Sequence, residues 1–354
     1  MLTLLVILAV AIAATPGVAI FMAQKPFGRM PSGARKARIM RSPFFRDGIL
    51  ENETPARIGS SGEHLPVVMW KFLTRKKPAR LIPADGEVPV VRSGLVHLPE
   101  GGDWLVWFGH SSFLMCLDGR TLLFDPVFYK ASPVSFVNRP FKGTDVFRPS
   151  DLPARIDYLV ISHDHWDHLD YRTVRELKDR VGKVVCPLGV GEDFVYWGYR
   201  GAQLIELDCN EDAADGGFVF HCLPTRHFSG RGIRTMRTQR ASWLVDAPSR
   251  RIFYSGDGGY SDRFARFGAA FPGIDLAIME NGQYNAEWRD IHMMPEYLGQ
   301  AVKDLHPARF MTMHHSKYAL ANHDWDEPRR NEQAAAEVSG VPLIVVQIGE
   351  VRPI

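Results

Sequence analysis

The stretch His163-Asp164-His165-Trp166-Asp167-His168 directly follows an apolar run, Asp157 to Ser162, that has the composition of a β-strand. Imidazole and carboxylate groups are the ligands that zinc takes when it keeps a coordination position open for water. Because alternate side chains of a strand share a face, we expect His163 and His165 to reach one ion, and Asp167 and His168 to reach a second. A solvated polar loop is the alternative, which the density of the cluster disfavours. The stretch therefore predicts a two-metal site.

Three further candidate ligands each stand one to four residues past a predicted strand: His227, Asp257 and His314. Loops at one edge of a sheet can bring such residues to the same place. Asp257 is the predicted bridge between the two ions, because a carboxylate offers both of its oxygens. Taken singly, each histidine is equally well explained as a buried structural residue. The residues alone do not distinguish His314 from the adjacent His315.

Short apolar or alternating runs, separated by turns, continue from residue 104 almost to the end of the chain. The predicted strands are Trp104 to Phe108, Ser112 to Leu117, Thr121 to Phe124, Asp157 to Ser162, Lys183 to Cys186, Gly217 to Leu223, Ser242 to Asp246, Arg251 to Ser255, Asp275 to Met279, Arg309 to Met313 and Leu343 to Gln347. The predicted helices are Asp170 to Arg180, capped by the Asp170 side chain, Gly191 to Gly198, Pro295 to Leu305 and Glu327 to Val338. This order predicts an α/β fold of four layers, with two sheets face to face and helices outside.

The composition is that of a globular protein with a large core, because 45% of the 354 residues are hydrophobic and 23% are charged. The formal net charge is only +2, and one basic cluster before Asp47 has no counterpart elsewhere, so we expect no nucleic-acid partner. The four cysteines contain no CxxC spacing and are predicted to be buried thiols rather than zinc ligands or disulfides: Cys116, Cys186, Cys209 and Cys222.

The first 23 residues are the clearest feature outside the predicted site. From Leu2 to Ala23 the only polar side chains are those of two threonines, and this length is enough to cross a bilayer as a helix. An uncleaved membrane anchor with a cytoplasmic catalytic domain, a cleaved signal with a periplasmic or secreted one, and a buried N-terminal helix are the three interpretations. We expect residues 24–100 to form a basic linker and irregular arm, and residues 101–354 to form the main domain.

Several fragments carry a family resemblance, in order and with similar spacing from about Trp104 to about Pro328: FGHSSF, LLFDPVF, HDHWDHLD, PTRHFSGRG, YSGDGGY and MHHSKYALAN. They resemble the metallo-β-lactamase superfamily and, within it, the N-acylphosphatidylethanolamine-hydrolysing phospholipase D family. The resemblance implies an αβ/βα sandwich that binds two zinc ions per chain. It assigns three ligands to the first ion and three to the second, with Asp257 bridging: His163, His165 and His227, then Asp167, His168 and His314.

The same resemblance implies a phosphoric diester hydrolase that acts on N-acylphosphatidylethanolamine-like phospholipids at a membrane surface, and leaves a homodimer open. Asp167 is then both ligand and catalytic residue, and His292, which matches a family histidine, is a residue for substrate contact or proton transfer, or else a surface histidine. Gly258 and Glu280-Asn281 depart from the family pattern, which puts substrate identity in doubt. A lactonase or other carboxylic-ester hydrolase, and a non-catalytic membrane-associated metal-binding protein, are the alternatives.

Three supporting features complete the predictions. Asp125 is either a partner that orients a ligand imidazole or a simple turn carboxylate. His110 is predicted to be structural, orienting a loop through hydrogen bonds, rather than to act directly. The insertion from Tyr129 to Arg148 is a candidate lipid-facing loop with Phe136 and Phe141 exposed, and an ordered loop packed on its own domain is the alternative.

Overall fold

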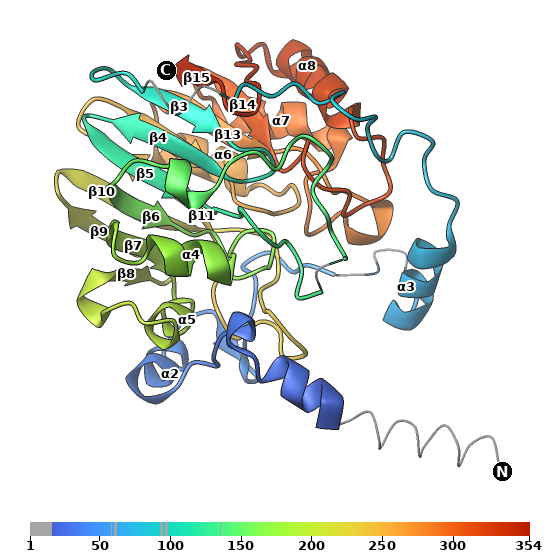
Figure 1. Ribbon diagram of the computed structural model, residues 1–354, viewed down its shortest axis with the longest axis vertical. Coiled ribbons are helices and arrows are strands. Elements are labelled where there is room, and N and C mark those ends of the chain that lie inside the picture. The colour runs from blue at the N-terminus through green and yellow to red at the C-terminus, as the bar shows by residue number, and fades with distance from the viewer. Residues whose placement is uncertain (1–15, 58, 60–61, 93–94, 96–97, 135) are drawn as a thin grey trace.

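Two β-sheets packed face to face form the centre of the molecule (Figure 1). This computed structural model describes all residues except 1–15, 58, 60–61, 93–94, 96–97 and 135. The first sheet has the order β15-β3-β4-β5-β6-β7-β8 and the second has the order β14-β13-β12-β11-β10-β9. Each sheet mixes an antiparallel part with a parallel part, as in β3 to β5 and β5 to β8 of the first. The predicted sandwich of two sheets with helices outside is confirmed.

The strands of the first sheet are β3 (Trp104–Trp107), β4 (Phe113–Leu117), β5 (Arg120–Phe124), β6 (Ile156–Val160), β7 (Val181–Pro187), β8 (Leu204–Leu207) and β15 (Val351–Pro353). Those of the second are β9 (Asp212–Asp215), β10 (Phe218–Pro224), β11 (Ala241–Asp246), β12 (Arg251–Tyr254), β13 (Leu276–Glu280) and β14 (Phe310–Met313). The core lies between the sheets, where the Trp243 indole donates to the Ile161 carbonyl over 2.9 Å and the ring of Tyr254 lies 5.3 Å from that of Phe113.

Helices cover the outer faces of the sandwich. Three of them, α6 (Arg263–Ala270), α7 (Pro295–Leu305) and α8 (Glu327–Ser339), belong to a second apolar core with the outer face of β12 to β14. The helices α4 (Tyr171–Leu177) and α5 (Gly191–Tyr196) lie by the other sheet. As predicted, the Asp170 side chain accepts from the first-turn amides of α4, those of Arg172 and Thr173.

One predicted strand is wrong and several elements were not predicted. Residues 343–347 form only a single bridge, between Leu343 and Phe310, because the backbone leaves the edge of β14 after two hydrogen bonds. The unpredicted elements α6, β8, β9 and β15 are short, and β9 in particular alternates Asp with Ala and shows little apolar periodicity. Strands β8, β9 and β15 are placed by pairing with β7, β10 and β3, and α6 is placed by packing in the second apolar core.

The arm over residues 24–100 is more regular than predicted. It contains α2 (Gly33–Ile39), a hairpin of β1 (Phe45–Arg46) and β2 (Ile49–Leu50), and α3 (Leu65–Thr74). Helix α2 is attached by charge, since Arg35 pairs with Glu192 and Glu206, and Ile39 is its one buried residue. A helix held in this way leaves a weak hydrophobic period in the sequence, which is why the arm was predicted to be irregular.

The predicted membrane anchor or signal over residues 1–23 lies mostly outside the described residues. Residues 16–22 of it are helical. Among the residues that the structure describes, we find no helix with the length and apolar character needed to cross a membrane. All four cysteines are free thiols, and the prediction that they are buried is confirmed for Cys186, Cys209 and Cys222 but not for Cys116, which is half-buried.

The insertion from Tyr129 to Arg148 differs from its prediction at one of its two aromatic residues. Phe136 is 70% exposed, whereas Phe141 is only 4% exposed and belongs to the main core. The backbone amide of Phe141 donates to the carbonyl of Lys317 over 2.7 Å, which holds this half of the loop against the domain. The expectation that both rings face lipid is therefore wrong for Phe141.

The two phenylalanines should respond oppositely to substitution. We expect Phe141→Ser to lower the free energy of unfolding by at least about 3 kcal/mol, because it empties a core position, and Phe136→Ser to change it by less than about 0.5 kcal/mol. Urea denaturation of the two variants would measure the difference. Equal midpoints would contradict the placement of this loop.

Candidate metal centre

The predicted ligands come together at one edge of the sandwich, beyond the ends of four strands from both sheets. The stretch from His163 to His168 follows β6, His227 follows β10, Asp257 follows β12 and His314 follows β14. The structure brings all seven predicted positions into interlocking groups of close ligand atoms. The expectation that strand ends assemble the site thus agrees with the geometry.

The first group consists of three histidines whose ring nitrogens converge. His163 Nε2 lies 2.9 Å and His227 Nε2 lies 3.1 Å from the same atom, Nδ1 of His165. Burial lowers the pKa of His163 and His227 well below the ordinary value and that of His165 to about 3, so all three rings are neutral. The other ring nitrogens of His163 and His227 face the Ser162 hydroxyl and the Ile291 carbonyl. Lone pairs that point at one another in this way fit a shared cation.

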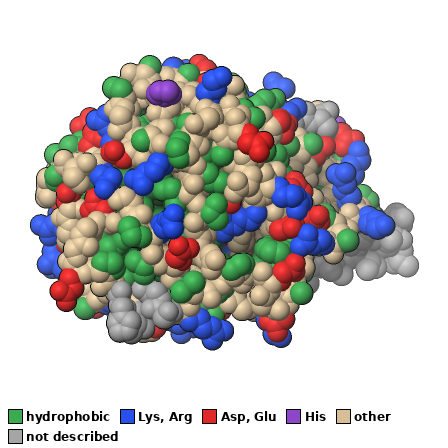
Figure 2. All heavy atoms as spheres, turned by 90° about the horizontal axis from the view of Figure 1, so that it is seen from above, with side chains coloured by type: hydrophobic (Ala, Val, Ile, Leu, Met, Phe, Trp, Pro, Cys, Tyr) green, Lys and Arg blue, Asp and Glu red, His purple; other side chains and the backbone are tan. Residues whose placement is uncertain are grey.

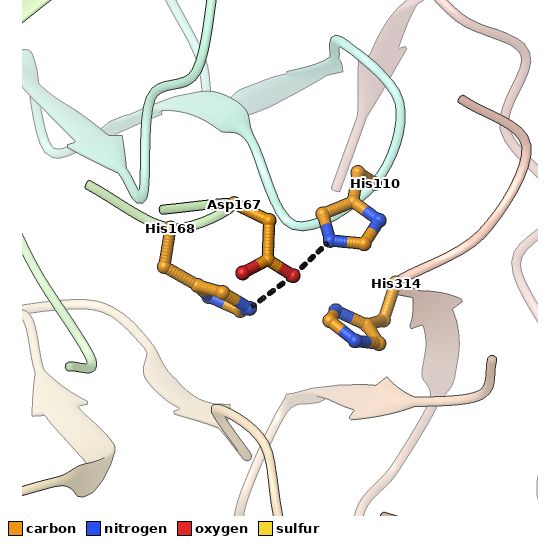
Figure 3. Close-up of side chains that lie close together, drawn as sticks. All are labelled: His110, Asp167, His168 and His314. Carbon is orange, nitrogen blue, oxygen red and sulfur yellow. Dashed lines mark hydrogen bonds and ion pairs between the residues drawn. The ribbon is translucent and has the colours of Figure 1, made fainter. Parts of the chain in front are cut away.

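The second group surrounds Asp167 (Figure 3). Asp167 Oδ2 lies 3.7 Å from His168 Nε2 and 2.9 Å from His110 Nε2. His314 Nε2 is buried and has no hydrogen-bond partner among the described residues. A buried nitrogen without a partner is costly unless a ligand satisfies it, so this atom also fits a bound cation.

Asp257 reaches both groups, as a bridging ligand would. One of its oxygens lies 3.1 Å from His168 Nε2 and 3.9 Å from His227 Nε2, and the other lies 3.3 Å from His314 Nδ1. Burial, opposed by His168 and assisted by the nearby carboxylate of Glu280, raises the pKa of Asp257 to about 7. A bound cation would stabilise a buried carboxylate whose charged form is disfavoured in this way.

Asp125 is a partner of a ligand imidazole, which excludes the alternative of a simple turn carboxylate. It is fully buried and accepts from His168 Nδ1 over 2.7 Å and from the Ser162 amide over 2.8 Å. The hydroxyls of Ser162 and Tyr254 donate to the same carboxylate. Because Nδ1 of His168 is engaged by Asp125, its Nε2 is turned towards Asp257.

His110 lies in the site, which the sequence interpretation as a structural histidine did not anticipate. Its backbone does hold a loop, since its amide donates to the His315 carbonyl and its carbonyl accepts from the His314 amide. In addition its ring lies 4.1 Å from that of His314 and its Nε2 contacts Asp167. The motif FGHSSF was a signal for this role, but no spacing rule connects residue 110 to residue 167.

Glu280 is a site residue that sequence reasoning treated only as a departure from the family pattern. It is fully buried, accepts from the Gly258 amide over 2.7 Å, and forms an ion pair with Nδ1 of His292. A Cβ atom at Gly258 would lie 2.3 Å from Thr225 Oγ1, so glycine is required there. The two departures therefore meet, and they hold His292 so that its ring lies 5.0 Å from that of His227 and 5.4 Å from that of His314.

The folded arrangement is that of a metal-dependent hydrolase, with histidine and carboxylate ligands at the loop edge of a two-sheet sandwich. Residues 120–315 match the family described as the beta-lactamase superfamily domain. An uncharacterized protein of Mycobacterium tuberculosis is 35% identical over 316 residues, which cover 88% of this chain and 84% of that protein. The chain therefore belongs to the metallo-β-lactamase superfamily.

The chain is also similar to two characterised proteins, one by sequence and one by structure. N-acyl-phosphatidylethanolamine-hydrolyzing phospholipase D 1 of Caenorhabditis elegans is 27% identical over 317 residues, covering 80% of this chain and 86% of that protein. The crystal structure of CmlA, a diiron beta-hydroxylase from Streptomyces venezuelae, is similar with a TM-score of 0.55 at 19% identity, covering 73% of this chain and 55% of that one. At that identity the structural likeness shows the fold alone.

Proposed function

We propose that the protein is a phosphodiesterase of the phospholipase D type that hydrolyses N-acylphosphatidylethanolamine-like phospholipids with two zinc ions. The observation that carries the proposal is the convergence of the seven predicted ligands at one edge, in a chain similar over most of its length to a phospholipase D of that specificity. The apolar sequence of residues 1–23 supports action at a membrane surface.

We infer from the contacts between the candidate ligands how they would divide between the two proposed ions. In the proposal His163, His165 and His227 would hold one ion, Asp167, His168 and His314 would hold the other, and Asp257 would be a ligand shared by the two. Such a pair of ions, when bound, lowers the pKa of water and offsets negative charge that develops on a substrate oxygen. The polar groups behind the ligands, above all Asp125, keep the rings in the orientation that this needs.

Two residues complete the proposed chemistry. Asp167 orients the attacking water and receives its proton, since its second contact, to His110, holds the carboxylate in place. His292 contacts the substrate, because its Nδ1 is engaged by Glu280 while its ring faces those of His227 and His314. Both assignments concern side chains that line the same edge of the sandwich.

A comparison of three substrates tests the proposal. Hydrolysis of bis(p-nitrophenyl) phosphate, an N-acylated phosphatidylethanolamine and a lactone would be measured before and after dialysis against chelator, then after return of zinc or iron. We expect turnover of both phosphodiesters, its loss on chelation, and its recovery with zinc. Faster turnover of the lactone would favour the carboxylic-ester alternative, and turnover of none of them a non-catalytic protein.

Metal content measured on the same preparations tests the number and the identity of the bound ions. Two equivalents of zinc per chain are expected for the active protein. Recovery with iron but not zinc would contradict the proposed metal while leaving the ligand set intact, an outcome of interest because a diiron hydroxylase shares this fold.

A further inference from the structure

Helix α3 exposes apolar side chains on the part of its surface that faces away from the protein. Trp70 is 69% exposed, Leu73 is 65% exposed, and Val67 and Met69 are 42% and 43% exposed. These four residues, which we call the α3 apolar face, lie on adjoining turns of a ten-residue helix. An apolar face of this kind on a helix is normally covered by protein or lipid.

The opposite side of α3 is attached to the wall of the candidate metal centre. Val68 is buried, and the ring of Phe72 packs edge-on against Trp288 with their centroids 5.0 Å apart. The segment that contains Trp288 continues directly to Ile291, whose carbonyl accepts from the Nδ1 of His227. The short segment from Trp288 to Ile291 therefore contacts both the exposed helix α3 and a predicted metal ligand, His227.

Basic residues directly follow the α3 apolar face. Arg75, Lys76 and Lys77 are consecutive and exposed, and Lys77 is held over the Phe72 ring at 4.6 Å. In Figure 1, α3 and the helical residues 16–22 both project from the body on its right-hand and lower sides, and Val18 and Ile20 of the latter are 50% and 71% exposed. The face of the molecule shown in Figure 2 carries Lys and Arg side chains interspersed with Asp and Glu, whereas the three basic residues after α3 are consecutive.

We propose that α3 is an interfacial helix that docks on an anionic lipid bilayer. Its apolar face enters the boundary between headgroups and acyl chains, with Trp70 at the interface, while Arg75 and Lys76 contact anionic headgroups. The basic cluster favours a bilayer with anionic headgroups over residues 1–15, which contain no acidic residue to pair with it. The inference rests on the proposed lipid substrate and names the surface that would bring the site to it.

Fluorescence of the full-length chain on vesicles tests this docking. Vesicles of phosphatidylcholine and phosphatidylglycerol, with and without brominated acyl chains, would be mixed with the parent protein and with Trp70→Phe. Bromine quenches only indoles that enter the bilayer, so the parent should lose a component of about one eighth of its emission, since Trp70 is one of eight tryptophans. The Trp70→Phe variant should lack that component, even if residues 1–23 bind the same vesicles.

A charge variant tests the lipid selectivity. We expect Arg75→Gln/Lys76→Gln to weaken the Trp70-quenching titration roughly 30-fold on anionic vesicles, because each basic residue at such a surface contributes roughly a factor of five. The matched control Arg41→Gln/Lys303→Gln removes two exposed positive charges elsewhere and should leave the titration unchanged. Pure phosphatidylcholine vesicles should quench the parent little.

The outcomes separate the docking surface from the proposed activity. Equal quenching of the parent and Trp70→Phe would overturn the proposal. So would a dimer, seen by light scattering, that Leu73→Ser dissociates while lipid has no effect on Trp70. The control Val338→Ser, which changes an exposed apolar residue of α8, should alter neither readout. Because no measurement here uses turnover, docking without phospholipid hydrolysis would refute the substrate and leave the surface standing.

Discussion

Replacement of Asp257 by alanine is expected to remove metal from the protein and to lower turnover of a small phosphodiester by on the order of a thousand-fold. Among the described residues, Asp257 is the carboxylate whose two oxygens lie within 4 Å of histidines of both groups, so its loss is expected to weaken the binding of both proposed ions. The substitution also removes the negative charge next to His168 Nε2, so the nearby histidines lose their counter-charge. Metal analysis of the purified variant, alongside its kcat, would measure both effects.

The matched control for this experiment is Asp262→Ala. Asp262 lies five residues further along the same connection, its side chain is 76% exposed, and its ion pair is with Arg266 on the surface. We expect the control to keep its metal and its activity. If purified Asp257→Ala retained two equivalents of zinc, the bridging assignment would be wrong.

The second large effect is expected for Asp125, which is not itself a predicted ligand but accepts a hydrogen bond from one, His168. Asp125→Ala would leave four buried donors without their acceptor, those of His168 Nδ1, the Ser162 amide and hydroxyl, and Tyr254. We expect a loss of about 3–5 kcal/mol in the free energy of unfolding, because removing one partner of a buried charged network leaves the others uncompensated. Chemical denaturation of metal-free protein would measure this loss without any contribution from bound ions.

The conservative variant Asp125→Asn separates packing from the orientation of His168. It preserves the shape of the side chain but offers one carbonyl oxygen in place of a carboxylate, so we expect metal affinity to fall by about 10- to 100-fold with a smaller loss of stability. Asp179→Asn, at a side chain 91% exposed, is the matched control. Parental metal affinity in Asp125→Asn would contradict the role of Asp125 as the group that orients His168.

Most positions of the candidate ligands could be predicted because they follow from local rules, whereas only the family resemblance separated His314 from His315. His163 and His165 alternate after β6. His227, Asp257 and His314 each stand just past a strand, so they were expected at the same edge of the sandwich as the two histidines. The partners behind the ligands could not be predicted in the same way. The contact of His110 with Asp167 and that of Glu280 with His292 join residues that no sequence period relates.

The errors in the fold have the same physical origin. Residues 343–347 have the composition of a strand, but a strand also needs a neighbour to pair with, and β14 offers these residues only one bridge. Phe136 and Phe141 look alike in an aromatic loop, but Phe141 is buried in the main core, where its backbone amide bonds to Lys317, and Phe136 is exposed. Composition carries no information about such long-range contacts.

By itself, then, the sequence determined the class of the protein, most strands of the sandwich and the residue types at the edge that carries the candidate metal centre, because hydrophobic period and ligand spacing act over a few residues. Only the tertiary structure decided which oxygen faces which nitrogen, that Asp257 reaches both groups of histidines, and that α3 presents its apolar face outward. Those properties depend on contacts between segments far apart in the chain, and these contacts exist only once the two sheets have packed together.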